Sequence, residues 1–341
     1  MVRKLPIRLR AKTELLLPAI PAFADHYMEG LTAHWKAIGR PFSPPEIDHF
    51  RRTLRELLKR AFDESPYSSV CVVYETDPPP RTTTSWQIGI RSSTIENEYA
   101  EWVAQRTPPL FGDYPDAKVT DLARSLGPPG EVAVLDVGAG TGRNTLPLAK
   151  EGFRADAVEL NPELAKILRD DVTQQGLPIR VIEGDILDPA TPVPQRAYNL
   201  VFLAEVVSHF REPAQLRALF ETADRLLLPG GLLLFSAFLA HGDYEPDDGA
   251  RAMGQVMYCS LFTRRELESA AASLPFDLVS DESTRQYEHA HLPPEHWPPT
   301  GWYEEWTAGR DVFDLPPGEC PIEMRWMTYR KRAAEPPPGG Q

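Results

Sequence analysis

Apolar residues recur at helical spacing in a segment near the start of the chain. Over residues 45–62 they follow one face of a helix: Ile47, Phe50, Leu54, Leu57, Leu58 and Ala61. Ser43 and Glu46, just before this stripe, match the pattern of a capping box. Two β-rich stretches come next, Ser69–Tyr74 and Thr82–Ile90, on either side of a run of prolines. The pattern predicts a small α+β unit at the N-terminal end.

Further along, the pattern changes to short apolar runs separated by amphipathic segments. Two predicted helices, Thr94–Gln105 and Asp116–Leu126, lead into this part. The runs typical of strands begin at Val132 and continue at Ala155–Val158, Ile179–Ile182, Tyr198–Leu203, Leu232–Phe235, Phe276–Ser280 and Ile322–Tyr329. Strands that alternate with helices are typical of an α/β fold built on a parallel sheet.

A glycine-rich loop follows the first of these strands, in the segment VAVLDVGAGTGRNTLPLA. Asp136 precedes Gly138, Gly140 and Gly142, and glycines can adopt positive φ angles or let a ligand approach the backbone closely. A dinucleotide-binding loop places its third glycine one position later, where this chain has Arg143. The spacing therefore disfavours pyrophosphate binding.

An acidic residue followed by G-x-G-x-G resembles motif I of the class I S-adenosylmethionine-dependent methyltransferases. Leu228-Pro229-Gly230-Gly231, before the fifth strand, also resembles the lead into that strand in this family. The resemblance covers about Val132–Tyr329. It implies a Rossmann-like, seven-stranded sheet with helices on both faces, and it implies S-adenosyl-L-methionine as the cofactor.

Further residues occupy positions that, in this family, contact the nucleoside part of the cofactor. Glu159 ends the second strand, where a carboxylate accepts hydrogen bonds from ribose hydroxyls, and Leu160 then borders the adenine. Asp185, followed by Ile186, comes after the third strand, where the resemblance implies an acidic side chain that faces the adenine amino group. Glu205, after the fourth strand, completes the predicted cofactor contacts.

His209 is the predicted catalytic base. It ends the segment Glu205-Val206-Val207-Ser208-His209, which resembles a segment of the ubiquinone-type O-methyltransferases. A base is needed when the acceptor is a hydroxyl or a protonated amine, and general-base catalysis contributes about 10²-fold to 10⁴-fold. A structural role at the start of a helix is the alternative for His209. The histidines and glutamates of residues 288–296 match no strong metal-site spacing, and no metal is predicted.

Composition and charge narrow the classes of function. The chain has 341 residues and a net charge of −13, which disfavours an extended surface for nucleic-acid phosphates. RNA stays an alternative partner because of basic residues near the N-terminus: Arg3, Lys4, Arg8, Arg10 and Lys12. No apolar run approaches the ~20 residues of a membrane span. Cys71, Cys259 and Cys320 are far apart and typical of reduced thiols, so we expect a cytoplasmic protein.

Two predicted insertions interrupt the core. Residues 241–258 follow the fifth strand, and residues 281–321 separate the sixth from the seventh. The second insertion is too aromatic for simple disorder because it contains Trp297, Trp302 and Trp306. We expect both insertions to line an acceptor pocket. Tyr99 and Trp102, in the helix before the core, either join that pocket or pack as ordinary core aromatics.

These observations predict three parts: an α+β appendage over 1–92, a methyltransferase domain over 93–331, and a Pro/Gly-rich tail over 332–341. The predicted activity is methyl transfer to an oxygen or nitrogen atom of a small molecule, with a specialised metabolite as one such acceptor. One alternative is a protein or RNA substrate docked by the N-terminal part. A second is a non-catalytic subunit that only binds S-adenosylmethionine. The oligomeric state stays open.

Overall fold

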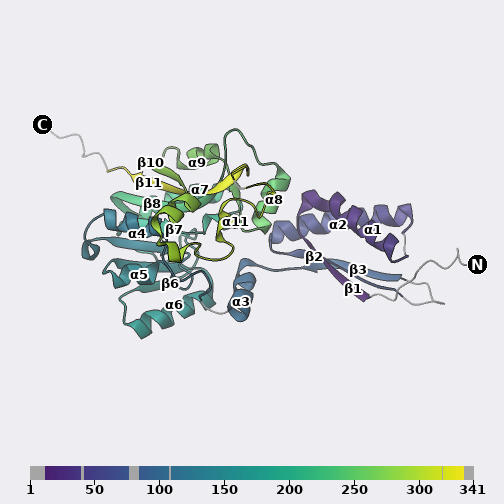
Figure 1. Ribbon diagram of the computed structural model, residues 1–341, viewed down its shortest axis with the longest axis horizontal. Helices are drawn as coiled ribbons and strands as arrows, with labels where there is room; N and C mark the ends of the chain where they lie inside the picture. Colours follow the sequence, from purple (N-terminus) through teal and green to yellow (C-terminus); the bar gives the residue numbers. More distant parts are fainter. Residues whose placement is uncertain (1–11, 40–41, 77–83, 107–108, 317, 334–341) are drawn as a thin grey trace, which may run out of the picture. The chain divides into compact units, whose positions relative to one another are not determined.

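The computed structural model divides into two compact units, which we describe separately (Figure 1). It describes residues 12–39, 42–76, 84–106, 109–316 and 318–333. Unit 1 comprises Met1–Glu101 and Asp247–Val256, and unit 2 comprises Trp102–Pro246 and Met257–Gln341. Most of the basic N-terminal residues, the proline run at 78–80 and most of the C-terminal tail lie outside the described residues. The division between the units falls inside helix α3 (Ile95–Gln105), and the predicted domain boundary at residue 92 stays a prediction.

Unit 1 is a three-stranded antiparallel sheet with helices. The sheet order is β1–β2–β3, from strands Lys12–Pro18, Ser69–Thr76 and Thr84–Arg91. Its core contains apolar side chains from α1 (Ala24–Ala37) and α2 (Pro44–Glu64). Helix α8 (Asp248–Val256) contacts the short helix η2 (Pro21–Phe23), so a segment from the second half of the chain completes this unit.

Helix α2 forms where the pattern predicted a helix. Its first turn is closed by the capping box, because the Ser43 N–H donates to the Glu46 carboxylate at 2.8 Å. The residues buried along it are three or four positions apart and face the unit 1 core: Phe50, Leu54, Leu58 and Ala61. The predicted helix and capping box are confirmed. Strand β1 and helix α1, which precede α2, were not predicted.

Unit 2 contains the predicted α/β sheet. Its strand order is β10–β11–β8–β7–β4–β5–β6, and a two-residue strand, β9 (Leu261–Phe262), pairs with β8. Strands β6, β5, β4, β7 and β8 run parallel, whereas β11 is antiparallel to both of its neighbours. The strands are Ala133–Val137 (β4), Arg154–Glu159 (β5), Arg180–Glu183 (β6), Tyr198–Leu203 (β7), Leu227–Ala240 (β8), Phe276–Ser283 (β10) and Ile322–Lys331 (β11). The predicted Rossmann-like, seven-stranded class is confirmed.

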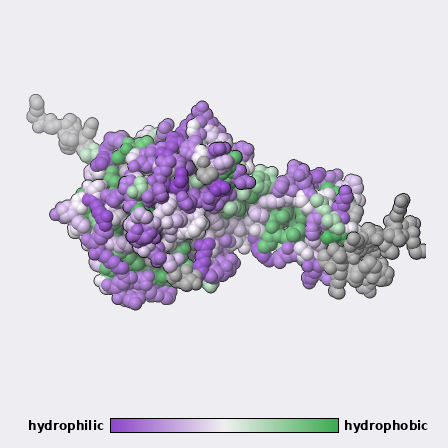
Figure 2. Space-filling model, viewed as in Figure 1, coloured by the Kyte–Doolittle hydropathy of each residue, from purple (hydrophilic) through white to green (hydrophobic). Residues whose placement is uncertain are grey.

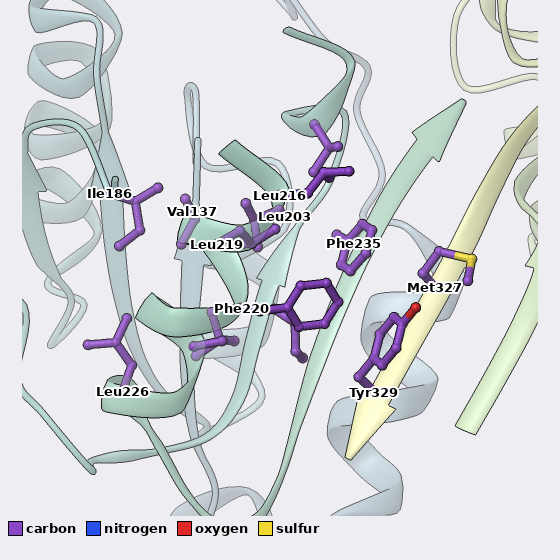
Figure 3. Close-up of a cluster of buried hydrophobic side chains, with 14 of the residues drawn as sticks. Val137, Ile186, Leu203, Leu216, Leu219, Phe220, Leu226, Phe235, Met327 and Tyr329 are labelled. Carbon is purple, nitrogen blue, oxygen red and sulfur yellow. The ribbon is translucent and has the colours of Figure 1, made fainter. Parts of the chain in front are cut away.

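Helices cover both faces of the unit 2 sheet. Apolar side chains of α7 (Pro213–Leu226) and α9 (Arg264–Ala271) pack on one face, where Phe220 of α7 lies against Phe235 of β8 and Tyr329 of β11 (Figure 3). On the other face the core contains side chains of α4 (Ala117–Ser125), α5 (Thr145–Lys150) and α6 (Pro162–Gln175). This sandwich fixes the carboxyl ends of the parallel strands, where α/β folds bind ligands.

The predicted insertion at 281–321 is ordered and anchored to the core. It contains α10 (Thr284–His291), η5 (Pro294–His296) and α11 (Tyr303–Thr307). Glu288 of α10 is fully buried and accepts hydrogen bonds from the Ala117 and Lys118 N–H groups at 2.7 and 3.2 Å. It also accepts one from the indole N–H of Trp326 at 3.0 Å. The insertion thus supplies the cap for the N-terminus of α4.

In the view of Figure 2, hydrophilic residues cover much of the surface of unit 2, and hydrophobic residues reach the surface in both units. Among the helices in the described parts of the chain, none combines the length and the apolar character that a bilayer crossing requires. Surface hydropathy of this kind identifies no partner by itself.

We expect Glu288→Gln to lower the free energy of unfolding by about 1–3 kcal/mol, because an amide NH₂ group would then face the backbone donors of α4. Urea unfolding followed by fluorescence measures this change. Glu295→Gln is the matched control, since Glu295 is exposed in the same insertion. Equal stability of the two variants would contradict the capping role.

Candidate active site

The glycine loop between β4 and α5 adopts the conformation that its sequence predicts. Gly138, Gly140 and Gly142 have φ angles of +70°, +56° and +92°. The loop is tied to the next strand because the Gly138 and Ala139 N–H groups donate to the Val158 carbonyl at 2.8 and 3.1 Å. Residues other than glycine rarely adopt these backbone angles. The three glycines therefore let the backbone fold tightly against β5.

Two predicted carboxylates lie buried beside this loop. Asp136 is 3% exposed and accepts a hydrogen bond from the Thr145 hydroxyl at 2.5 Å, and burial raises its pKa to about 7. Glu159 is 5% exposed and accepts hydrogen bonds from the Gly140 and Asn161 N–H groups at 2.7 and 2.8 Å. Burial also raises the pKa of Glu159. Glu159 joins the loop to the end of β5, the position predicted for ribose binding.

The other predicted nucleoside contacts lie at the same edge of the sheet. Strands β5 and β6 are parallel with Glu159 opposite Glu183, and the Gly184 N–H donates to the Glu159 carbonyl at 3.0 Å. Asp185 is exposed, and its carboxylate accepts a hydrogen bond from the Leu187 N–H at 2.8 Å. Leu160 is 45% exposed, whereas Ile186 is 7% exposed. An exposed leucine beside a buried carboxylate suits an adenosine, which has an apolar ring and ribose hydroxyls.

Sequence reasoning missed the role of Arg143. Its guanidinium donates to Asp116, just before α4, at 2.6 Å, and to Glu205, after β7, at 2.9 Å. The exposed fractions of the side chains are 9% for Arg143, 2% for Asp116 and 20% for Glu205. Burial raises the pKa of Glu205 to about 7, and Arg143 opposes that rise. In the sequence, Arg143 was noted only because it occupies the position where a dinucleotide-binding loop has its third glycine.

Aromatic side chains connect the loop to the predicted base. Phe111 lies against Gly140, where an added Cβ would be 3.3 Å from its ring. Ring centroids are 6.5 Å apart for Phe111 and Trp102, 5.6 Å for Trp102 and Tyr258, and 5.7 Å for Tyr258 and His209. We call Trp102, Phe111 and Tyr258 the aromatic wall. Burial lowers the pKa of His209 to about 4, so the imidazole is neutral at pH 7.

The histidines of the 288–296 segment have aromatic neighbours. His296 stacks on Tyr114 with ring centroids 3.3 Å apart, and the rings of His289 and Trp297 are 5.0 Å apart. Glu288 caps α4, as described above. Among the described residues, no group of three or more histidine, cysteine or acidic side chains is arranged to hold a metal ion.

The strand order, the glycine loop and the carboxylate at the end of β5 define unit 2 as a Rossmann-like, nucleoside-binding α/β domain. Comparison with known families identifies a more specific class for part of this domain. Residues 134–231, from β4 into β8, match the family model of a methyltransferase domain. This segment includes the loop and all nine predicted cofactor contacts, from Asp136 to Glu205.

Curated relatives match the same part of the chain. The demethylmenaquinone methyltransferase of Tropheryma whipplei is 29% identical over 106 residues, which are 31% of this chain and 41% of the relative. The ubiquinone biosynthesis O-methyltransferase of Photorhabdus laumondii is 30% identical over 103 residues, which are 30% of this chain and 41% of the relative. The chain thus spans about two fifths of the length of these relatives.

A solved structure supports the fold alone. It is a Galdieria sulphuraria protein, provisionally assigned as a sarcosine dimethylglycine methyltransferase, with a TM-score of 0.50 and 16% identity. The match covers 70% of this chain and 98% of that one. Over residues 134–231 the family model and the relatives confirm the predicted class: this part of unit 2 is a methyltransferase domain of the S-adenosyl-L-methionine-dependent kind.

We expect Gly142→Ala to destabilise the protein more than Gly176→Ala. Both glycines have positive φ angles, +92° and +63°, so both variants carry a backbone cost of about 1–2 kcal/mol. At Gly142 the new Cβ would also lie 2.6 Å from Leu168 Cδ1 and 2.8 Å from Leu146 Cγ, whereas nothing lies within 4 Å at Gly176. Thermal unfolding compares the two, and equal melting temperatures would contradict the role of close packing at Gly142.

Proposed function

We propose that this protein transfers the methyl group of S-adenosyl-L-methionine to an oxygen or nitrogen atom of a small, flat, largely apolar acceptor. The aromatic wall carries this proposal, because it leads from the glycine loop at Gly140 to His209. Aromatic side chains bind apolar rings well, and ligand pockets combine such walls with a few polar groups. We include specialised metabolites among the proposed acceptors.

The relatives support a small acceptor. Their names assign them to the methylation of demethylmenaquinone and to ubiquinone biosynthesis, and both names refer to small molecules. Cys71, Cys259 and Cys320 are free thiols, which supports the proposed cytoplasmic location. We therefore propose a small molecule as the methyl acceptor and the cytoplasm as the location of the protein.

The residues around the loop fit the cofactor. In this proposal Glu159 accepts hydrogen bonds from the ribose, and Leu160, which is 45% exposed, contacts the adenine. Asp185, which follows β6 beside β5, is the proposed partner of the adenine amino group. When bound, S-adenosylmethionine supplies a methyl group already activated by its sulfonium. The protein then contributes mainly alignment of the acceptor with that methyl group, which can supply much of the acceleration.

His209 is the proposed base for an acceptor that must lose a proton. Because burial holds its pKa at about 4, the imidazole carries a free nitrogen lone pair across the neutral range. It can accept the proton of an acceptor hydroxyl as the oxygen–carbon bond forms and the methyl–sulfur bond breaks. An ammonium acceptor would have to give up its proton first, which frees the nitrogen lone pair for the attack. Tyr258 packs edge-on against its ring and limits the ring's movement.

The first test is calorimetric titration of S-adenosylhomocysteine into wild type, Glu159→Gln and Glu163→Gln. We expect Glu159→Gln to weaken binding about 10-fold to 100-fold, because it removes a charged acceptor of hydrogen bonds. Glu163→Gln should bind like wild type, since Glu163 is exposed on the next helix. A wild type that does not bind S-adenosylhomocysteine would overturn the proposed function.

The second test addresses the base with a panel of small phenols, amines and quinols as acceptors. With an accepted substrate, His209→Gln should lower kcat by about 10²-fold to 10⁴-fold without changing S-adenosylhomocysteine affinity. His49→Gln is the control, because His49 is exposed on helix α2. An unchanged kcat in His209→Gln would support the structural alternative. Methylation of proteins or RNA, with no small acceptor, would support docking by the N-terminal part.

A further inference from the structure

Arg106, just after α3, places a positive charge on the aromatic wall. Its guanidinium carbon lies 4.0 Å from the ring centroid of Trp102, which is within the range of a cation–π contact. The Arg106 N–H donates to the Trp102 carbonyl at 2.9 Å, so the stacked pair lies at the C-terminal end of the helix. The face of the indole holds the guanidinium, and the N–H groups at the guanidinium edge stay available to another partner.

The charge of Arg106 is unpaired among the described residues. The residue is exposed, and no Asp or Glu oxygen in the described parts of the chain lies within 4.0 Å of its guanidinium nitrogens. Arg143, by contrast, donates to two carboxylates. Arg106 can therefore bind the anionic group of a ligand without first breaking an ion pair.

The aromatic wall connects Arg106 to the proposed base. From Trp102 the path runs through Tyr258, at a centroid distance of 5.6 Å, to His209, at 5.7 Å. Trp102, Phe111 and Tyr258 are all partly exposed. A ligand can therefore reach the wall along its length, with the cation at one end and the imidazole at the other.

The segment around Tyr258 is held against the segment of His209. Tyr258 has a φ of +56°, and strained backbone of this kind clusters at ligand sites. Two residues later, the Ser260 N–H donates to the Ser208 carbonyl at 3.0 Å. The wall therefore keeps a fixed position relative to the proposed base.

Charge and shape favour a carboxylate on the acceptor. The whole chain has a net charge of −13, so an anionic acceptor is attracted by a local cation and not by the protein as a whole. A guanidinium matches a carboxylate with two parallel N–H bonds. A carboxylate attached to an aromatic ring can lie in the plane of that ring, so the acceptor keeps the flat shape that the wall favours.

We propose that Arg106 is a specificity-determining residue, which binds the carboxylate of an aromatic hydroxy acid whose hydroxyl faces His209. Trp102 and Tyr258 contact the acceptor ring. The acceptor oxygen forms a bond to the methyl carbon, the methyl–sulfur bond breaks with its electron pair left on sulfur, and the hydroxyl proton goes to His209. This inference rests on the proposed function and deepens it, because it names the chemical class of the acceptor.

The test compares a panel of hydroxybenzoic and hydroxycinnamic acids with the matching amides, in which an uncharged group replaces the carboxylate. With S-adenosylmethionine as the methyl donor near neutral pH, wild type should have the higher kcat/KM for the acids. We expect Arg106→Gln to reduce this preference about 3-fold to 10-fold, mainly through KM, because an exposed charged contact contributes modestly to binding. Arg106→Lys should keep part of the preference, since it keeps the charge but loses the paired N–H donors.

Arg330→Gln is the matched control, because it removes the same charge from an exposed position on β11, where Arg330 pairs with Leu232. It should keep the wild-type preference for the acids.

Three outcomes would overturn the inference while wild type still binds S-adenosylhomocysteine. They are no preference for the acids in wild type, an unchanged preference in Arg106→Gln, and no methylation of any acid in the panel. Equal losses for acids and amides in Arg106→Gln would also overturn it, since they would indicate a structural role at the end of α3. Failure of wild type to bind S-adenosylhomocysteine would instead overturn the proposed function.

Discussion

The buried Arg143 bridge is the interaction on which the arrangement of the site depends. It joins three segments that are distant in sequence: the residue before α4, the glycine loop and the end of β7. Asn144 reinforces it, because its side chain exchanges hydrogen bonds with Asp116 at 2.8 and 2.9 Å. Removal of one partner from a buried ion pair typically costs 3–5 kcal/mol, since the other charge stays buried. Loss of either carboxylate or of the guanidinium would therefore leave a buried charge without its partner.

Buried carboxylates around the bridge give the site an electrostatic bias. Burial raises the pKa of Asp136 to about 7 and that of Glu288 to about 8, well above their ordinary values. The folded state therefore binds more protons than the unfolded state, and the stability contributed by these groups falls as the pH rises from about 4.5 to about 8. A bound cation offsets that loss because it favours the ionised carboxylates. S-adenosylmethionine is such a cation, whereas the product after methyl transfer has lost the sulfonium charge.

Features that local rules determine could be predicted from the sequence. The glycine loop needs positive φ angles, and buried strands need apolar runs, so the loop, the strands and helix α2 were predicted. Strand β1 was missed because its alternating exposure arises only from pairing with β2, more than fifty residues later. Arg143 was missed for a similar reason, since its ion pairs are with carboxylates that only the fold brings together. The roles assigned to the cofactor contacts and His209 stay predictions.

The segment at 241–258 contributes residues to both units. Its expected place in the acceptor pocket stays a prediction. Helix α8 belongs to unit 1 by its contacts, whereas Tyr258 belongs to unit 2, where its ring centroid lies 5.7 Å from that of His209. Deletion of residues 1–92 would remove η2, the part of unit 1 that α8 contacts. Loss of activity in that deletion would thus be expected even if unit 1 bound no substrate. A substitution of Leu16, on the outer face of the unit 1 sheet, tests substrate docking and leaves the contact between α8 and η2 in place. Leu16 is suitable because it is 46% exposed.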